Sequence, residues 1–297
     1  MIDFIEPLQK LPSNRKSRGH KLHENLIEVY GAMILRVKSR MDAGEDVPDC
    51  LVKTLLEVQE DENLDLEDLC MLCAVFTVLE VPPTSSIIQW FLALIALYPE
   101  IQARAHAEID QVVGQETWPA PEDESRLPYL RAIIKEVQRT HAPLWIPTPH
   151  YSTEDFVYNG VYIPKGTVMI LDCYTMHHNE KRYPDPFTFN PDRYLDDNLS
   201  CAQSANLSDA MQRDHWTFGA GRRICPGVTL AERMLYLAIS RLLWSFTIHE
   251  VPGEPISLKE CSGAFGRTPL PYRVNLVPRH DNLGSVLPDD GTVNIKI

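Results

Sequence analysis

The sequence predicts a mainly α-helical fold with a small β-sheet, an α+β arrangement. Helical hydrophobic patterns fill roughly the first half of the chain, short β-rich segments follow them, and one more helical pattern precedes the C-terminal region. The 297 residues are 44% hydrophobic, which suffices to bury a substantial core and excludes global disorder.

Apolar residues recur every three or four positions, the period of an α-helix, in several segments. This spacing predicts helices over 20–43, 64–80, 84–96, 102–113, 127–140 and 226–245. Pro82 and Pro83 separate the second of these from the third. Because an interior proline removes a hydrogen-bond donor and clashes with the preceding turn, we expect a break in the helix there.

The β-rich segments cover 146–151, 156–163 and 167–172, each bounded by turn residues. Asn159-Gly160 indicates a two-residue hairpin, because both central positions of a type I′ turn need positive φ. We therefore expect a small sheet after the first helices. Further hairpins are expected up to Pro278, followed by a loose tail over 279–297.

Charge and cysteine content exclude several classes of protein. Lys and Arg number 28 against 41 Asp and Glu, and the resulting charge of −13 repels a phosphate backbone, so no nucleic-acid partner is expected. Seven widely spread cysteines, an odd number, are typical of reduced thiols. The C-x-x-C pair Cys70 and Cys73 lies in a helical apolar pattern, so core packing is expected there and not a zinc or redox site.

No charged-then-apolar signal sequence opens the chain, and the longest apolar tract, 87–98, is too short to span a bilayer. We therefore expect no membrane anchor in this chain, and its localisation stays open.

The segment from Phe218 to Gly227 reads Phe-Gly-Ala-Gly-Arg-Arg-Ile-Cys-Pro-Gly and places a cysteine just before a predicted helix. Pro226 suits a first helical position, so Cys225 is expected at or near the N-cap. There, free N–H groups and the positive helix end stabilise a thiolate, the form that binds metals. Gly221 would permit a tight turn, and Gly227 would leave room for a flat ring.

Two further side chains complete this candidate site. Phe218 could shield the sulfur, and Arg223 could neutralise an anionic group at the edge of the ring. Together the segment describes a cradle for a porphyrin that carries carboxylates. The alternative interpretation of Cys225 is a small buried hydrophobe, the commonest fate of a free cysteine.

This segment resembles the heme-binding signature of the cytochrome P450 family, F-x-x-G-x-R-x-C-x-G, whose five fixed positions are met by Phe218, Gly221, Arg223, Cys225 and Gly227. A chance match is on the order of one in ten thousand. The resemblance implies heme (iron protoporphyrin IX) as cofactor, with Cys225 as the iron ligand and catalytic thiolate. It covers residues 1–278, similar to the C-terminal, heme-binding part of such a domain, and a complete family member has a large portion ahead of it.

Outside the signature, Glu136 and Arg139 are three apart on a predicted helix and share a face. Arg193 lies in a segment similar to the family's P-x-R segment, and the resemblance implies a Glu-Arg-Arg network that organises the fold without taking part in catalysis. His150 stands where relatives often carry a residue that contacts a heme propionate, but a structural histidine is an equal alternative. The remaining histidines show no metal-ligand spacing.

The family's A-G-x-D-T-T segment, which helps deliver protons to oxygen, falls on Leu79 to Thr84. Pro82 replaces the acid and Pro83 the alcohol, so Thr84 is the single catalytic match. Glu80 and Thr84 could partly replace the relay, the proton delivery could be lost, or an exon boundary could be misread. We favour impaired or altered oxygen activation, because proline offers neither an N–H nor an acidic side chain.

The resemblance implies a monooxygenase that inserts one oxygen atom from O₂ into a small organic substrate, with electrons from an NADPH-dependent reductase. The residue pattern, especially over 183–187, is most similar to that of fungal enzymes of secondary metabolism. Eukaryotic members of the family are anchored to the endoplasmic reticulum. Two alternatives stay open: a truncated, impaired or inactive heme-binding remnant, and a structural helical protein whose Cys225 binds nothing.

Overall fold

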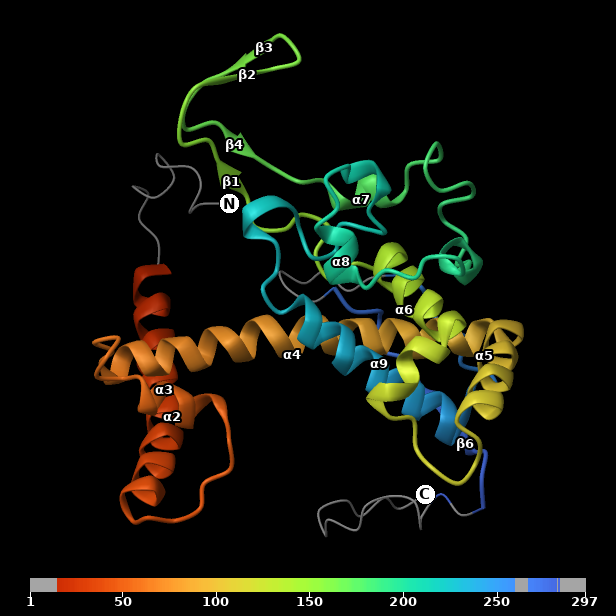
Figure 1. The fold of residues 1–297 in the computed structure, drawn as a ribbon, viewed down its shortest axis with the longest axis horizontal. Helices are drawn as coiled ribbons and strands as arrows, with labels where there is room; N and C mark the ends of the chain where they lie inside the picture. The colour runs from red at the N-terminus through yellow and green to blue at the C-terminus, as the bar shows by residue number, and fades with distance from the viewer. Residues whose placement is uncertain (1–14, 260–266, 282, 284–297) are drawn as a thin grey trace. The chain divides into compact units, whose positions relative to one another are not determined.

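The computed structural model describes residues 15–259, 267–281 and 283 (Figure 1). The fold is mainly helical with small sheets, as the sequence predicts. Contacts divide the chain into two compact units, Met1–Val81 and Pro82–Ile297.

The first unit contains α2 (Arg15–Asp42), α3 (Leu51–Glu57) and the beginning of α4 (Leu66–Leu97). Helix α2 packs on α3 and ends, as expected, just before Gly44, whose φ of 71° only glycine adopts readily. Cys70 and Cys73 lie in a small core with Ile34 and Leu69, which confirms the core-packing expectation. Burial raises the pKa of both thiols, so they behave as apolar side chains.

The predicted break at Pro82 and Pro83 is wrong, because α4 runs without interruption from Leu66 to Leu97. The ring of proline fixes φ near the helical value, so what the two prolines remove is hydrogen bonds to the carbonyls four residues earlier. Those carbonyls belong to Val78 and Leu79, whose residues are exposed, so water can satisfy them. Packing on both sides then holds the helix together.

The uninterrupted α4 is also long and apolar enough to cross a membrane by length and composition, which the tract 87–98 alone did not suggest. A core helix passes the same test. The C-terminal half of α4 supplies much of the second unit's core, including Ile87, Trp90, Phe91, Leu94 and Ile95, all at most 2% exposed.

The second unit packs that half of α4 with α5 (Pro99–Val112), α6 (Pro128–Thr140) and α9 (Val228–Ser245), close to the predicted ranges. Figure 1 shows α6 and α9 next to α5, with the short helices α7 and α8 above them. The short helical elements are α7 (Cys173–His177), α8 (Cys201–Ala205) and the 3₁₀ turns η2 (Pro121–Arg126), η3 (Pro191–Tyr194), η4 (Ala210–Gln212) and η5 (Gly221–Arg223).

The strands pair locally, and in the described ranges they form three two-stranded antiparallel sheets and not one small sheet. The pairs are β1 (His150–Tyr151) with β4 (Val168–Met169), β2 (Phe156–Tyr158) with β3 (Val161–Ile163), and β5 (Phe246–Glu250) with β6 (Val274–Pro278). The predicted hairpin turn is confirmed: Asn159 and Gly160 have φ of 50° and 79°.

The boundary expected at Pro278 coincides with the end of β6. Directly after it, Arg279 makes a two-pronged ion pair with Asp110, at 2.7 and 2.9 Å, and Leu283 is 4% exposed. These contacts attach Arg279 and Leu283 to the second unit, and the loose tail expected over 279–297 stays a prediction for the residues after them. Residues 284–297, like Cys261, lie outside the described residues.

Candidate functional site

The segment 218–227, called the cysteine loop below, folds back on itself before α9. The Cys225 N–H donates to the Phe218 carbonyl over 2.9 Å and closes the loop. Gly219 and Gly221 have φ of 81° and 67°, so glycine is required at both turns. The tight turn expected at Gly221 is confirmed, and Gly219 adds a second one.

Cys225 lies near the N-cap of α9, two residues before it, and the helix begins two residues later than expected. Gly227 is the N-cap, since its carbonyl accepts the first helical bond, from Ala231 N–H at 2.9 Å. Pro226 therefore lies in the turn before the helix. That turn is held by the Val228 N–H, which reaches the Cys225 carbonyl over 3.4 Å.

The cysteine loop fits a heme bound through sulfur. Cys225 is half-buried, so its thiol can reach a ligand outside the core. Arg223 is exposed, and within the described ranges no carboxylate pairs with it, so its charge remains available to an anionic edge. A Cβ on Gly227 would lie 3.8 Å from the Cys225 sulfur, in van der Waals contact with it, so the glycine leaves the space beside the sulfur open. The thiol can bind the iron of a porphyrin, the guanidinium can pair with one of its carboxylates, and the glycine leaves room for its ring.

The Glu-Arg-Arg network expected from the sequence forms inside the second unit. Arg139 donates to both carboxylate oxygens of Glu136 at 2.7 Å, and neither side chain is exposed to solvent. Arg193 reaches the same carboxylate at 3.3 Å. These contacts tie α6 to η3 and to the irregular segment before it.

A second set of bonds connects this network with the start of the cysteine loop. Arg139 donates to the carbonyls of His177 and Pro186, at 2.7 and 2.9 Å. The His177 ring accepts the Trp216 N–H on Nε2, over 2.8 Å, and burial holds the pKa of His177 well below its usual range. A neutral imidazole therefore joins the ion pair to the residue two positions before Phe218. His177 is the last residue of α7, and its neighbour His178 is the C-cap.

His150 and Thr84 lie on other elements than the cysteine loop, and their expected roles stay predictions. His150 lies on β1, exposed and paired with Met169. Thr84 lies on α4, partly buried, one turn before Ile87. In the described part of the chain no hydrogen bond or ion pair joins either residue to residues 218–227.

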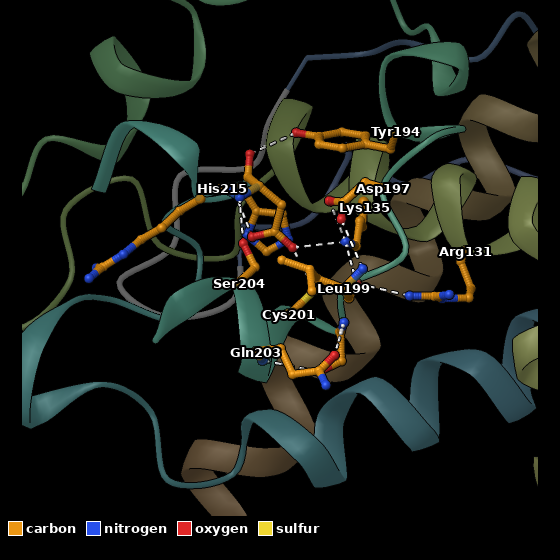
Figure 2. Close-up of polar contacts among 12 residues, drawn as sticks. Arg131, Lys135, Tyr194, Asp197, Leu199, Cys201, Gln203, Ser204 and His215 are labelled. Atoms are coloured by element: carbon orange, nitrogen blue, oxygen red, sulfur yellow. Dashed lines mark hydrogen bonds and ion pairs between the residues drawn. The ribbon is translucent and has the colours of Figure 1, made fainter. Parts of the chain in front are cut away.

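A cluster that the sequence analysis missed lies next to the cysteine loop (Figure 2). Cys201, Asp214 and His215 are buried, and their ligand atoms lie within 4.8 Å of one another. The Cys201 sulfur is 3.5 Å from His215 Nε2, which is 3.2 Å from Gln138 Oε1. Burial raises the pKa of the Cys201 thiol well above its usual range and lowers that of the His215 imidazole. Apart from the adjacent Asp214-His215 pair, no residue spacing in the sequence indicates this cluster.

The same cluster contains a buried cation. Lys135 Nζ lies 2.7 Å from Asp197 and 3.2 Å from Asp214, and it also donates to the Leu199 carbonyl at 2.7 Å. Its side chain is 4% exposed, so these bonds lie out of water. They fix α6 to the segment between η3 and α8, as Figure 2 shows.

Comparisons with known proteins agree with this geometry. The family model described as Cytochrome P450 matches residues 1–276. The chain is 34% identical over 287 residues to Cytochrome P450 monooxygenase polD of Polytolypa hystricis (strain UAMH7299), covering 94% of this chain and 54% of that protein. It is 34% identical over 298 residues to Cytochrome P450 monooxygenase verL of Clonostachys rogersoniana, covering 98% and 54%.

Among solved structures, a zebra fish cytochrome P450 with abiraterone superposes with a TM-score of 0.73 at 29% identity, over 86% of this chain and 59% of that one. The chain spans about half the length of the curated relatives that it matches. Heme is the expected cofactor of proteins with this fold and signature. Because the family model covers nearly the whole chain, the protein belongs to the cytochrome P450 family.

Proposed function

We propose that this chain is the heme-binding part of a monooxygenase that inserts one oxygen atom from O₂ into a small organic substrate, in secondary-metabolite biosynthesis. An NADPH-dependent reductase supplies the electrons. The observation that supports this best is the cysteine loop, in which a half-buried Cys225 stands beside the exposed Arg223. Similarity to fungal monooxygenases supports the reaction class and the metabolic setting.

Each residue of the proposed site has a distinct task. Cys225 binds the iron as a thiolate, and Arg223 pairs with a propionate at the ring edge. Heme bound in this way supplies the activation of O₂. The Glu136–Arg139 pair holds α6 and, through His177, the start of the cysteine loop in place. Thr84 Oγ1 is the remaining hydroxyl of the oxygen-activation segment that can donate a proton.

A second candidate function, heme binding without efficient turnover, rests on Pro82 and Pro83 within α4. Neither residue has an N–H, a hydroxyl or a carboxyl group, so neither can hold or move a proton. Near them, Glu80 and Thr84 are both only partly buried and keep polar side chains. In this alternative the chain retains the cofactor, but electron use is uncoupled from product.

A ferrous-CO difference spectrum of the heme-loaded chain tests the site. The wild-type protein is expected to give the thiolate-type band, and Cys225→Ser is expected to lose it while keeping its helix content. The exposed Cys50, changed to Ser, is the matched control and should leave the band in place. An unchanged band in Cys225→Ser contradicts the assignment. NADPH consumption with a reductase, compared with product formed, then separates the two candidate functions.

A further inference from the structure

The cluster of Cys201, Asp214 and His215 combines three residue types that bind metals, together with the amide oxygen of Gln138. All four residues are buried, at 5% exposure or less. We infer that these four side chains form a zinc site, separate from the proposed heme ligand Cys225. The inference does not depend on the proposed function.

The spacing of the donor atoms matches a tetrahedral zinc site. With zinc bonds of about 2.3 Å to sulfur and about 2.0–2.2 Å to nitrogen and oxygen, the edges of the tetrahedron are about 3.3–3.6 Å. The Cys201 sulfur lies 3.5 Å from His215 Nε2 and 3.8 Å from Gln138 Oε1, and the last two atoms are 3.2 Å apart. Three donors therefore stand within a few tenths of an ångström of the required separations.

Asp214 supplies the fourth donor. Its residue is 5% exposed, and its Oδ2 has no hydrogen-bond partner among the described residues, although it faces Lys135 at 3.2 Å. The Lys135 ammonium compensates the charge of this oxygen but gives it no hydrogen bond, so its lone pairs remain available to a metal ion. The other oxygen, Oδ1, accepts the His215 N–H at 2.7 Å, which fixes the orientation of the carboxylate.

The charge of the cluster also favours a dication. The carboxylates of Asp197, Asp214 and Glu232 act on the His215 ring, against the single ammonium of Lys135. Cysteine binds zinc as a thiolate, so binding releases one proton and changes the net charge by one positive unit in this acidic surrounding.

Lys135 is compatible with a metal on Asp214. It holds Asp197 at 2.7 Å and the Leu199 carbonyl at 2.7 Å, so it keeps two partners whatever Asp214 binds. A ligating carboxylate normally has such an outer partner, which orients it. On the imidazole, metal at Nε2 places the ring proton on Nδ1, and the long 3.4 Å bond from Thr217 N–H is given up.

The ligands come from α6, α8 and the segment that enters the cysteine loop. Gln138 and Cys201 are far apart in sequence, and a metal between them would fasten both elements to residues 214 and 215. Zinc in this place is structural, because all four positions around it are filled by protein.

Zinc measured in the full-length, heme-loaded protein tests the inference. After dialysis against a chelator, we expect zinc to remain in a stoichiometric amount by mass spectrometry of the elements. Cys201→Ser and His215→Gln should lose it. Cys173→Ser is the matched control, since Cys173 is also buried but its sulfur donates to the Trp216 carbonyl. Cys225→Ser should lose the heme spectrum and keep the zinc, so the two sites can fail separately.

X-ray absorption at the zinc edge of the wild-type protein gives a measurement that needs no variant to fold. One sulfur at about 2.3 Å with nitrogen and oxygen at about 2.0–2.2 Å supports the site. A shell with two sulfurs points to Cys70 and Cys73 and overturns it. Loss of all zinc from the wild-type protein on dialysis, or its retention in both Cys201→Ser and His215→Gln, overturns it as well.

Discussion

Arg139 donates a hydrogen bond to each carboxylate oxygen of Glu136, both at 2.7 Å, and both side chains are fully buried. Changing Arg139 to Ala removes both 2.7 Å bonds and leaves the buried carboxylate with Arg193, at 3.3 Å, as its remaining ion-pair partner. We expect a loss of about 3–5 kcal/mol in the free energy of unfolding, measured by urea titration followed by circular dichroism.

The control for this change is Arg104→Ala, because Arg104 pairs with Asp192 where both side chains are about half exposed, at 46% and 55%. That pair should contribute at most about 1 kcal/mol. Equal losses in the two variants would show that burial does not set the strength of the Arg139 pair.

Two glycines of the cysteine loop should respond differently to alanine. Gly221 has a φ of 67° with open space around it, so alanine there costs about 1–2 kcal/mol through the backbone alone. Gly227 has no such φ, and its new methyl group would lie 3.8 Å from the Cys225 sulfur. We expect Gly221→Ala to lower both thermal stability and heme retention.

Gly227→Ala should lower heme retention, while the melting temperature of the heme-free protein falls less than in Gly221→Ala. Both quantities can be followed by the Soret absorbance and by calorimetry of the same preparations. If Gly227→Ala retained heme as well as the wild-type protein, the ring would not lie on that face of the loop.

The partly buried His141 should make stability depend on acid. Its ring lies 3.9 Å from that of Trp90, and burial lowers the pKa of His141 to about 3. Between this pKa and the value near 6.5 in the unfolded chain, the unfolded chain binds more protons than the folded one. The contribution of His141 to the free energy of unfolding is therefore complete above about pH 6.5. It falls as the pH is lowered below that value, by up to about 1.4 kcal/mol per pH unit.

Urea midpoints measured from about pH 7 down to about pH 5 should therefore fall less steeply in His141→Gln than in the wild-type protein. His249→Gln removes an exposed histidine on β5 and should leave the slope unchanged. The same slope in all three proteins would mean that His141 becomes protonated without opening the fold.

Replacing Pro82 by Asp and Pro83 by Thr should raise the share of NADPH electrons that end in product, if these prolines limit proton delivery. The pair Pro82→Ala and Pro83→Ala restores the two backbone N–H groups without any acid or alcohol, and so separates helix geometry from proton donation. Both double variants should gain stability, but coupling should improve in the Asp-Thr variant alone. Equal coupling in the two would refute the proton-delivery explanation.

Sequence predicted best those features that are fixed locally. Asn159 and Gly160 specify their turn by backbone preference alone, and residues 128–140 form their helix where the hydrophobic period places it. The Glu136–Arg139 pair followed from a spacing of three on one helix, strengthened by family resemblance.

Features set by long-range packing were missed. The core contacts of Trp90 and its neighbours keep α4 helical through two prolines, against local preference. The first helical carbonyl of α9 belongs to Gly227, so the helix begins two residues after Pro226, where the sequence predicted its start. Cys201, Gln138 and His215 meet only because α6 and α8 pack together with the segment before the loop, which no spacing reveals.

Hydrogen bonds fix the chain at Asp214 and Trp216, just before the cysteine loop. Tyr183 and Tyr194 both donate to the Asp214 carbonyl, at 2.6 and 3.0 Å, and the Trp216 N–H donates to the His177 ring. Upstream of these bonds, residues 206–212 lie almost entirely on the surface. Related chains can therefore gain or lose residues there without shifting the thiol, so alignments of this region should show variable length on one side of position 214 and constant length on the other.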